Sequence, residues 1–407
     1  MTNPFYDPYQ VLSKVYGAGA HLKLALADTP IEELHRARTV RTVYGVLEHD
    51  GYLTACIATI AQKSPKSAVR IVLKIALYWL IFLEKPRYMV TDTAVTLLKK
   101  LGKGGAAGFV NAALRAFDEK KVVIPAGDEG LALTTPYPLF AIEKIRSDWG
   151  ARTEAIVRAK SCGVTVRFVR GAEKYLDRPY IATPFENVYI FERFARDENF
   201  LVGDYTFQSV GSIAICGVVE PCENMLDACA APGGKSVLLA GKCAHVTASE
   251  LHAHRVSLIE SYAARMGTNN VTAVQADSTL FRPAWENAFD GVLCDVPCSG
   301  FGTVTENPDL PLGKTAESVA ELAATQRAIL ENCARYVGRG GHLYYSTCSL
   351  FSEENDGIVA PFLAAHPEFV CCEAQSPLAH ERTACGLQFL PDTAYGAGFY
   401  IAKMRKL

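Results

Sequence analysis

The chain has 407 residues, more than a single ordinary domain requires, so two or three domains are expected. Hydrophobic residues make up 49% and charged residues 21%, which excludes a disordered chain and indicates a globular one. The first ten residues, MTNPFYDPYQ, lack the apolar core of a signal peptide. The most apolar run, Ile71–Leu83, is interrupted by Lys74 and is too short to cross a bilayer. We therefore expect a cytoplasmic protein that does not enter a membrane.

Charge is distributed unevenly along the chain. The formal net charge is −2, but residues 1–125 contain 17 Lys and Arg against 10 Asp and Glu, an excess of +7, and the remainder carries −9. A basic N-terminal segment favours an anionic partner such as RNA. An ordinary imbalance of surface charge explains the same numbers equally well.

Thirteen cysteines are scattered without a disulfide framework, a CxxC pair or the spacing of a zinc site. In a reducing cytoplasm they are expected to be free thiols, most of them small buried side chains, and no metal site is predicted. A catalytic cysteine must then be identified by its context.

Residues 5–117 show helical periodicity without an alternating strand pattern, which predicts an all-helical domain over residues 1–125. Pro30 and Pro65 lie near helix starts, and a glycine-rich stretch, Gly102–Gly105, separates the last two helices. The expected helical segments are Val11–Ala25, Ile31–Leu47, Tyr52–Ala61, Val69–Leu83, Val90–Leu101 and Ala106–Phe117.

The middle of the chain has a mixed pattern. A linker is predicted over residues 118–135, where a charged stretch precedes Pro125, Gly127 and Gly130. A small α+β subdomain is expected over residues 130–200. Its expected elements are helices Leu139–Asp148 and Thr153–Ala159 and strands Val164–Val169 and Val188–Phe191.

Strands and helices alternate from Asn224 onward, which predicts an α/β domain over residues 201–407 with a parallel, doubly wound sheet. The expected strands are Asn224–Cys229, His245–Glu250, Val271–Asp277, Phe289–Asp295 and Gly341–Cys348, followed by Phe369–Glu373, Leu387–Leu390 and Gly398–Met404. The expected helices are Lys235–Lys242, His254–Met266, Ala316–Val337 and Glu353–His366.

Three acidic residues mark the ends of three successive expected strands: Asp227, Glu250 and Asp277. Ligands of open parallel sheets bind beyond the carboxyl ends of the strands, where an acidic residue can accept ribose hydroxyls. The turn after the first strand contains Gly233 and Gly234, which permit close approach of the backbone. It matches neither GxGxxG nor a Walker A loop, so a nucleoside without a pyrophosphate clamp is predicted, which favours S-adenosylmethionine over NAD.

Two cysteines, Cys298 and Cys348, lie just past the ends of the fourth and fifth strands. A lone cysteine there more often serves packing, but two beside a methyl donor favour chemistry. Carbon 5 of cytosine is a poor nucleophile until a thiolate adds to carbon 6, which is covalent catalysis. A second group must then assist loss of the C5 proton and release of the enzyme. Asp295 could polarise the ring nitrogen N3, and the target base must be exposed first.

These motifs resemble the RsmB/Sun family of ribosomal RNA cytosine-C5 methyltransferases over nearly the whole chain. The resemblance rests on the runs Leu226-Asp-Ala-Cys-Ala-Ala-Pro-Gly-Gly-Lys235, Asp295-Val-Pro-Cys-Ser-Gly300, Ser346-Thr-Cys-Ser349, Glu353-Glu-Asn355 and Gln326-Arg-Ala-Ile-Leu330. It implies a Rossmann-like methyltransferase domain. It also implies a preceding all-α NusB-like RNA-binding domain, on the runs Ile75-Ala-Leu-Tyr78 and Gly108-Phe-Val-Asn-Ala-Ala-Leu-Arg115, and a small RNA-gripping subdomain.

The resemblance also implies roles for individual residues. Cys348 is the expected nucleophile, Cys298 assists proton removal or release, and Asp295 contacts the target base, with Lys235 counted among the catalytic residues. Gln208 matches a glutamine that precedes the cofactor domain, and Arg255 matches a recurrent arginine whose alternative role, a helix-surface salt bridge, is equally good. The expected cofactor-binding residues are Asp227, Cys229, Ala230, Ala231, Pro232, Gly233, Gly234, Lys235, Glu250, Arg255, Asp277, Ser278 and Asp295.

The chain departs from the family pattern at several positions. The paired arginines of relatives are replaced by Thr303–Asp309, including Thr305, Glu306 and Asn307, and a His and an Asp near the C-terminus by Asp392 and Ala397. In the middle subdomain the usual Arg-Val-Asn becomes Arg167-Phe-Val169. Loss of cations weakens phosphate gripping, so the target position is predicted less sharply than the reaction.

The leading hypothesis is an S-adenosylmethionine-dependent enzyme that methylates cytosine in 16S ribosomal RNA and acts as a monomer. Its alternatives are an RNA-binding protein with impaired catalysis, against which the intact cysteine pair argues, and a cytosine-C5 methyltransferase for another RNA. An amine methyltransferase is disfavoured, since it needs no cysteine pair and typically carries an Asn/Asp-Pro-Pro-aromatic run instead of Asp295-Val-Pro-Cys298.

Overall fold

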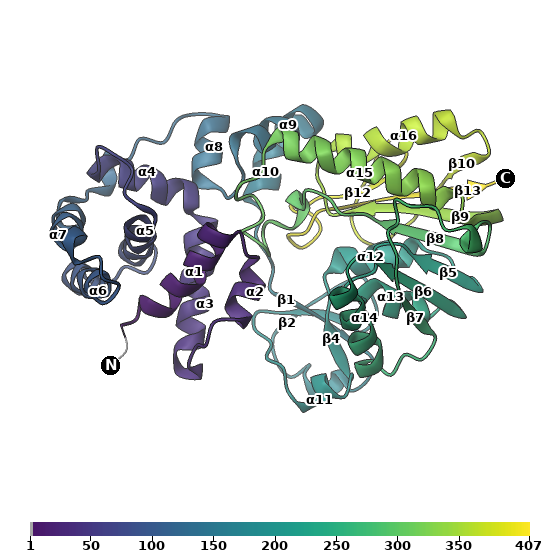
Figure 1. The fold of residues 1–407 in the computed structure, drawn as a ribbon, viewed down its shortest axis with the longest axis horizontal. Helices are drawn as coiled ribbons and strands as arrows, with labels where there is room; N and C mark the ends of the chain where they lie inside the picture. Colours follow the sequence, from purple (N-terminus) through teal and green to yellow (C-terminus); the bar gives the residue numbers. More distant parts are fainter. Residues whose placement is uncertain (1–2) are drawn as a thin grey trace. The chain divides into compact units, whose positions relative to one another are not determined.

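The computed structural model describes residues 3–407, which form two compact units. The helical unit comprises the residues up to Arg146 together with Asn307–Gly313. The sheet unit comprises Ser147–Glu306 and Lys314–Leu407 (Figure 1).

The helical unit confirms the predicted all-α fold of the N-terminal region. Its central helix is α5, whose residues from Val69 to Trp79 are nearly all buried, and Lys74 within it pairs with Asp50. The helices are α1 (Tyr6–Ala18), α2 (Leu22–Ala27), α3 (Glu33–Glu48), α4 (Asp50–Ile60), α5 (Ser67–Ile81), α6 (Arg87–Lys100), α7 (Ala107–Ala116) and α8 (Asp128–Thr134), and α9 (Leu139–Trp149) extends past Arg146.

Two predicted segments differ from the structure. The expected single helix Val11–Ala25 is two helices, because Gly19 adopts a left-handed conformation with φ 63° and ends α1. The expected linker over 118–135 contains α8, which begins after Gly127 with two acidic residues in its first turn, a favourable place for negative charge. Asn307–Gly313 packs into this unit through Asp309, whose Oδ2 accepts a hydrogen bond of 2.9 Å from Leu22 N.

The sheet unit contains a nine-stranded mixed sheet in the order β11-β12-β13-β9-β8-β5-β6-β7, with β10 paired to β13. Strands β5 to β9 run parallel, as predicted, but β10 and β12 pair antiparallel with β13, so the expectation of a wholly parallel sheet was wrong. The connection from β12 to β13 is too short for a parallel crossover, which needs a dozen residues or more. The strands are β5 (Asn224–Asp227), β6 (His245–Glu250), β7 (Val271–Gln275), β8 (Phe289–Asp295), β9 (Val337–Thr347), β10 (Phe369–Cys372), β11 (Glu381–Arg382), β12 (Gly386–Phe389) and β13 (Phe399–Lys406).

Helices cover both faces of this sheet (Figure 1). On one face lie α12 (Val210–Val218), α13 (Gly234–Ala240) and α14 (Ala253–Arg265), and on the other α15 (Ala316–Ala334) and α16 (Asp356–Ala365). Two apolar clusters fill the layers between helices and strands. The helix predicted to begin at Glu353 begins at Asp356, because Ser352–Glu354 forms a 3-10 turn, η7.

A second, four-stranded antiparallel sheet has the order β2-β3-β1-β4. Strands β1 (Val164–Phe168) and β3 (Val188–Phe191) match the predicted ones, whereas β2 (Tyr180–Ala182) and β4 (Tyr205–Phe207) were not predicted. An aromatic cluster that includes Phe168, Tyr175 and Tyr205 packs on this sheet. A short helix, α10 (Thr153–Arg158), precedes β1, and another, α11 (Glu198–Leu201), lies between β3 and β4 in the chain.

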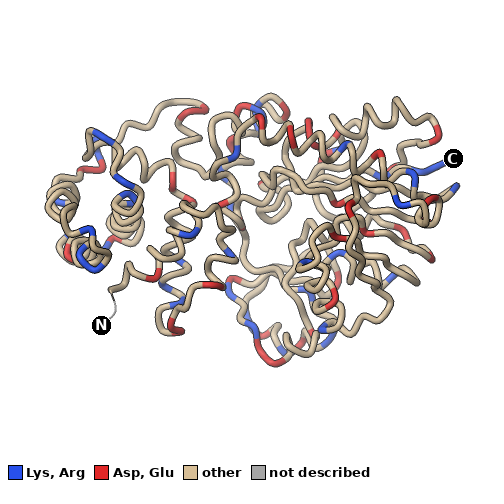
Figure 2. Tube along the Cα trace, in the orientation of Figure 1, with Lys and Arg blue, Asp and Glu red and all other residues tan. Residues whose placement is uncertain are grey.

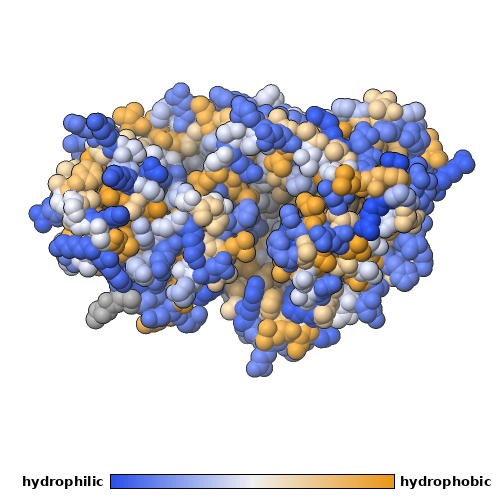
Figure 3. Space-filling view, viewed as in Figure 1, coloured by the Kyte–Doolittle hydropathy of each residue, from blue (hydrophilic) through white to orange (hydrophobic). Residues whose placement is uncertain are grey.

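The surfaces of both units are mixed in character. Figure 2 shows basic residues on several helices of the helical unit, with acidic residues among them. On the face drawn in Figure 3, hydrophobic residues are scattered among hydrophilic ones. Within residues 3–407, no helix combines the length and the apolar character needed to span a membrane.

Candidate active site

Asp227, the last residue of β5, is fully buried. Ser236 Oγ on α13 donates a hydrogen bond of 2.7 Å to its Oδ2, whereas its Oδ1 is buried without a partner. Burial raises the pKa of Asp227 to about 6. A buried acceptor without a donor is costly, and such a group calls for an explanation. The unpaired oxygen fits a donor group of a bound nucleoside or amino acid.

Glu250 and Asp277 stand at the same edge of the sheet, because β5, β6 and β7 are neighbouring parallel strands. Glu250 ends β6, is 4% exposed, and accepts a 3.0 Å hydrogen bond from His252 N. Asp277 was predicted to be the last residue of its strand, but it lies two residues beyond the end of β7. Its carboxylate accepts hydrogen bonds of 2.9 and 2.6 Å from Thr279 N and Oγ1. The three predicted carboxylates are therefore gathered at one edge.

Arg255 on α14 is tied to this edge. Its Nη1 lies 3.3 Å from Glu250 and its Nη2 donates to the carbonyl of Ala231 at 3.4 Å. Arg255 was predicted either to bind the cofactor or to form a salt bridge on the helix surface. The salt bridge is present, and its partner, Glu250, is one of the predicted cofactor-binding acids.

The turn between β5 and α13 is closely packed. Ala230 N donates to Ser249 O and Ser278 Oγ donates to Ala228 O, so the turn is tied to the ends of β6 and β7. Gly233 has φ 104°, and a Cβ there would lie 3.2 Å from Ile259 Cα, which explains a glycine. Gln208 Nε2 donates to Gly234 O at 3.0 Å, so the predicted glutamine lies against the turn. The Ala231–Pro232 peptide bond is cis, and burial raises the pKa of the Cys229 thiol.

Lys235 connects this edge to the cysteine motifs. Its Nζ donates to Asp295 Oδ2 at 2.7 Å, and Ser346 Oγ donates to Asp295 Oδ1, also at 2.7 Å. Burial alone would lower the pKa of Lys235, but the charge and hydrogen bond of Asp295 outweigh burial and raise that pKa. Lys235 is therefore a cation, and Asp295 accepts one donor on each oxygen.

Cys298 and Cys348 are brought into contact, with their Sγ atoms 3.1 Å apart and Cys348 N donating to Cys298 Sγ at 3.2 Å. Cys298 follows β8 and Cys348 directly follows β9, and these two strands are neighbours. The hydrogen bond with Cys348 and burial raise the pKa of Cys298 well above its usual value, with the charge of Glu354 acting in the same direction. Cys298 thus keeps its proton at neutral pH and can donate it toward Cys348.

Gln326 and Glu354 belong to the motifs that resemble the family, but no role was predicted for either residue. Both are fully buried, and both contact the segment that contains Cys298: Gln326 Nε2 donates to Pro297 O at 3.0 Å, and Glu354 accepts from Ser299 N at 2.8 Å. Neither position could be placed from the sequence, since both come from helices or turns distant along the chain from Cys298.

The positions that depart from the family pattern have structural partners of their own. Asp392 accepts from Arg152 Nε at 2.7 Å, and Ala397 is buried in an apolar cluster. Asp309, at the end of the altered run, belongs to the helical unit. Arg167 Nε donates to Gln208 Oε1 at 3.1 Å.

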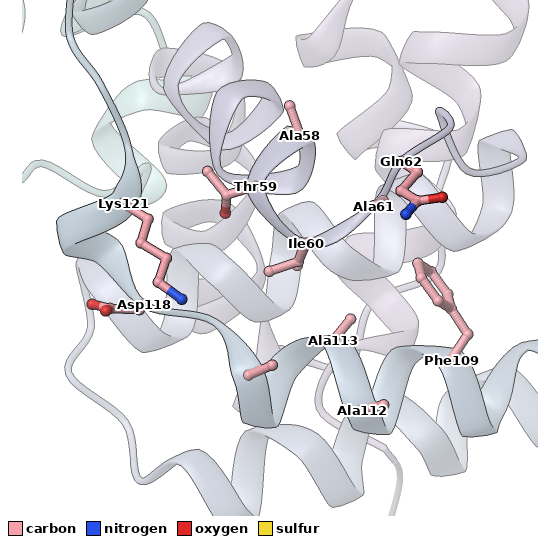
Figure 4. Close-up of a pocket in the computed structure, with 11 residues that line it drawn as sticks. Ala58, Thr59, Ile60, Ala61, Gln62, Phe109, Ala112, Ala113, Asp118 and Lys121 are labelled. Atoms are coloured by element: carbon pink, nitrogen blue, oxygen red, sulfur yellow. The ribbon is translucent and has the colours of Figure 1, made fainter.

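A hollow of about 440 Å³ lies apart from these residues, between α4 and α7 of the helical unit (Figure 4). Ala58, Ile60, Phe109, Ala112 and Lys121 are among its lining side chains. It contains none of the predicted site residues. Among residues 3–407 there is also no cluster of His, Cys, Asp and Glu suited to a metal ion.

Two protein-family models match separate parts of this chain. Residues 218–405 match the family model described as 16S rRNA methyltransferase RsmB/F, and residues 9–119 match the NusB family. A probable ribosomal RNA small subunit methyltransferase B of Bacillus subtilis is 29% identical, with 95% of this chain and 94% of that protein covered. Ribosomal RNA small subunit methyltransferase B of Xylella fastidiosa is also 29% identical, with 98% and 99% covered.

Solved structures show the same fold. The crystal structure of PH0851 superposes with a TM-score of 0.85 at 21% identity and covers 99% of this chain and 98% of its own. The structure of NSun6 from Pyrococcus horikoshii with SFG gives 0.59 at 19% identity and covers 67% of this chain and 98% of its own.

The residues present fit the cofactor of this family. The unpaired Oδ1 of Asp227 and the carboxylates of Glu250 and Asp277 offer acceptors for amino and hydroxyl groups, and the glycine turn leaves backbone groups accessible. The chain thus contains a Rossmann-like methyltransferase domain of the RsmB/F family that uses S-adenosylmethionine, preceded by an all-α domain of the NusB family.

Proposed function

We propose that the chain methylates carbon 5 of a cytosine in 16S ribosomal RNA, with Cys348 as nucleophile and Cys298 as the group that assists release. One observation carries the proposal: two thiols from the ends of neighbouring strands lie 3.1 Å apart, and the Lys235–Asp295 pair stands beside the same strand ends. Two thiols in contact have no use in methylation of an amine. The names of the relatives, which refer to the small ribosomal subunit, support the choice of RNA.

The first step belongs to Cys348. The sulfur of Cys348 adds to carbon 6 of the cytosine, and the thiol proton passes to the ring nitrogen N3. The Lys235–Asp295 pair supplies the charged groups that assist this proton transfer. The electrons displaced from the C5–C6 bond then make carbon 5 nucleophilic. Bound S-adenosylmethionine supplies the methyl group.

The last step needs a proton relay between the cysteines. The Cys298 proton passes to Cys348 as the S–C6 bond breaks, and Cys298 takes the proton that leaves carbon 5. Both thiols are then restored, and the proton on N3 is released with the product. This use of Cys298 agrees with its raised pKa, which keeps it protonated until Cys348 leaves.

We place Asp227, Glu250, Asp277 and the turn from Cys229 to Lys235 around the cofactor, with Arg255 and Ser278 supporting them. The NusB-family domain and the β1–β4 sheet would hold RNA, and the chain would act as a cytoplasmic monomer, with domains over 1–125, 130–200 and 201–407. These assignments follow the motif positions and the contacts described above.

The proposal is tested with three variants and one RNA substrate. Cys348→Ala should abolish methyl transfer to transcribed 16S RNA while leaving S-adenosylhomocysteine binding intact, and Cys298→Ala should accumulate a protein–RNA adduct that survives a denaturing gel. Cys162→Ala, which alters an exposed thiol, is the matched control and should behave as the unmodified protein.

The acceptor itself is identified by bisulfite sequencing of total RNA from cells with and without the gene. One protected cytosine in 16S RNA should disappear with the gene. A normal rate in Cys348→Ala would contradict the mechanism, and an unchanged bisulfite pattern together with RNA co-purification would favour an RNA-binding protein with impaired catalysis.

A further inference from the structure

A buried polar network lies between the two loops that contain the cysteines. Its centre is Glu354, at the end of η7, which is fully buried. Ser299, Ser349 and Gln326, which contact it, are each at most 1% exposed. A carboxylate in such a place is expensive unless donors surround it.

Four donors converge on the Glu354 carboxylate. Its Oε1 accepts from Ser299 N at 2.8 Å and from Gln326 Nε2 at 2.9 Å. Its Oε2 accepts from the hydroxyls of Ser299 and Ser349. The carbonyl of Glu354 also accepts from Tyr345 OH at 2.6 Å, which ties η7 to β9.

The two serines are the residues that directly follow the two cysteines. Ser299 follows Cys298 and Ser349 follows Cys348, so one carboxylate holds the backbone beside both thiols. Gln326 adds a third hold, because its amide also donates to Pro297 O at 3.0 Å, on the other side of Cys298. Glu354 and Gln326 thereby hold the Cys298 segment on both sides and the Cys348 segment at Ser349, and Thr347 on the other side of Cys348 donates to Asn355 Oδ1 at 2.6 Å.

We propose that Glu354 is a positioning residue that sets the separation of the Cys298 and Cys348 thiols through its hydrogen bonds to Ser299 and Ser349. Its effect on methyl transfer rests on the function proposed above, whereas its effect on the distance between the thiols does not. Glu354 touches neither sulfur, and it positions them through the residues that follow them.

The donors predict which substitutions preserve the network. In Glu354→Gln the amide oxygen still accepts from Ser299 N and Gln326 Nε2, and the amide nitrogen donates to the two serine hydroxyls, which accept as readily as they donate. In Glu354→Ala all four donors lose their acceptor. The conservative variant should therefore rescue what the alanine variant loses.

The separation of the thiols is measured by their oxidation to a disulfide in the full chain without RNA or cofactor. Diamide is the oxidant: its N=N bond takes up the two protons and two electrons that the thiols lose, and the S–S bond forms. Peptide mass spectrometry follows the Cys298–Cys348 link over time. Cys222 and Cys243, whose sulfurs lie 3.5 Å apart, provide an internal reference pair.

The expected result is a formation rate in Glu354→Gln within about threefold of the unmodified protein and at least about tenfold slower in Glu354→Ala, with the reference pair unchanged. Asp356→Ala is the matched control. Asp356 lies two residues further on and accepts from four donors, Thr383 Oγ1, Ala384 N, Cys385 N and Tyr400 OH, none of them next to a catalytic cysteine. It should leave the Cys298–Cys348 rate within about threefold.

If Glu354→Ala does not fold, the double variant Ser299→Ala with Ser349→Ala serves in its place, because it removes only the hydroxyl donors. It should slow formation of the Cys298–Cys348 disulfide at least about threefold. An unchanged rate in either variant, or a rate in Glu354→Gln as slow as in the alanine variant, overturns the proposal. Methyl transfer is measured in parallel, where kcat should fall in Glu354→Ala with little change in the KM for RNA. Absence of methylation in the unmodified protein, with the cross-linking pattern as expected, would refute the proposed function and leave the positioning role standing.

Discussion

Asp227 and Glu354 are both fully buried carboxylates of the sheet unit, yet the protein surrounds them differently. Glu354 has four donors on its two oxygens, whereas Asp227 has Ser236 on one oxygen and nothing on the other. A buried acceptor whose donors all come from the protein can hold the scaffold together, whereas an acceptor without a donor is open to a donor group of a ligand. Substitution of Glu354 should lower the stability of the protein, whereas substitution of Asp227 should raise its stability without cofactor and weaken cofactor binding.

The largest effect is expected for Glu354→Ala on stability. Removal of the acceptor strands four buried donors and should lower the free energy of unfolding of the sheet unit by about 4 kcal/mol. Urea unfolding followed by circular dichroism measures the change, with Asp356→Ala as the control that removes a comparable acceptor elsewhere. A loss below about 1 kcal/mol would show that the network adds little to the scaffold.

A somewhat smaller effect, of opposite sign, is expected for Asp227→Asn without cofactor. The pKa of Asp227 is raised to about 6 by burial, above its value in an unfolded chain, so the ionised form destabilises the folded state above pH 6. The asparagine variant should therefore be more stable than the unmodified protein at pH 7.5, by up to about 3 kcal/mol.

That difference should shrink as the pH falls from 6 toward 4, because Asp227 then takes up its proton in the folded state and the penalty disappears. Thermal unfolding of both proteins at several pH values measures it. Ser236→Ala, which removes the hydroxyl donor to Asp227, is the control and should make stability depend more steeply on pH than in the unmodified protein. A difference independent of pH would mean that Asp227 is not a strained buried acid.

The contrast between these carboxylates also separates what the sequence could predict from what it could not. The strand-end acids were predictable, because parallel strands bring their carboxyl ends to one edge whatever the rest of the fold does. The same argument brought Cys298 and Cys348 together, since each follows one of two neighbouring strands. Helical periodicity and the Gly-rich breaks predicted most of the N-terminal helices, but not the break between α1 and α2 or the helix α8.

Long-range hydrogen bonds were not predictable in this way. Three of the four donors to Glu354 belong to residues 28 or 55 positions away, and the fourth, Ser349, is five positions away; the periodicity of the sequence does not reveal such pairings. Strand β13 was predicted over Gly398–Met404, but its antiparallel direction was not, because the short connection from β12 decides that direction. The split of the first predicted helix depended on the left-handed conformation of one residue, Gly19, inside an otherwise periodic run.

The smallest effect is expected for Arg255→Ala on cofactor affinity. The Arg255 side chain is 43% exposed and lies 3.3 Å from Glu250, so it supports from the surface one of the acids that we propose to bind the cofactor. An exposed ion pair contributes about 0.2–1 kcal/mol, which corresponds to a loss of affinity of less than about fivefold. Asp227→Asn removes a buried charged acceptor and should weaken binding by about 30-fold, or about 2 kcal/mol. Calorimetric titration with S-adenosylhomocysteine measures both. Equal losses of affinity in the two variants would mean that Arg255 contacts the cofactor directly. A ligand contact at this edge could then also be made by a side chain that already has a partner in the protein.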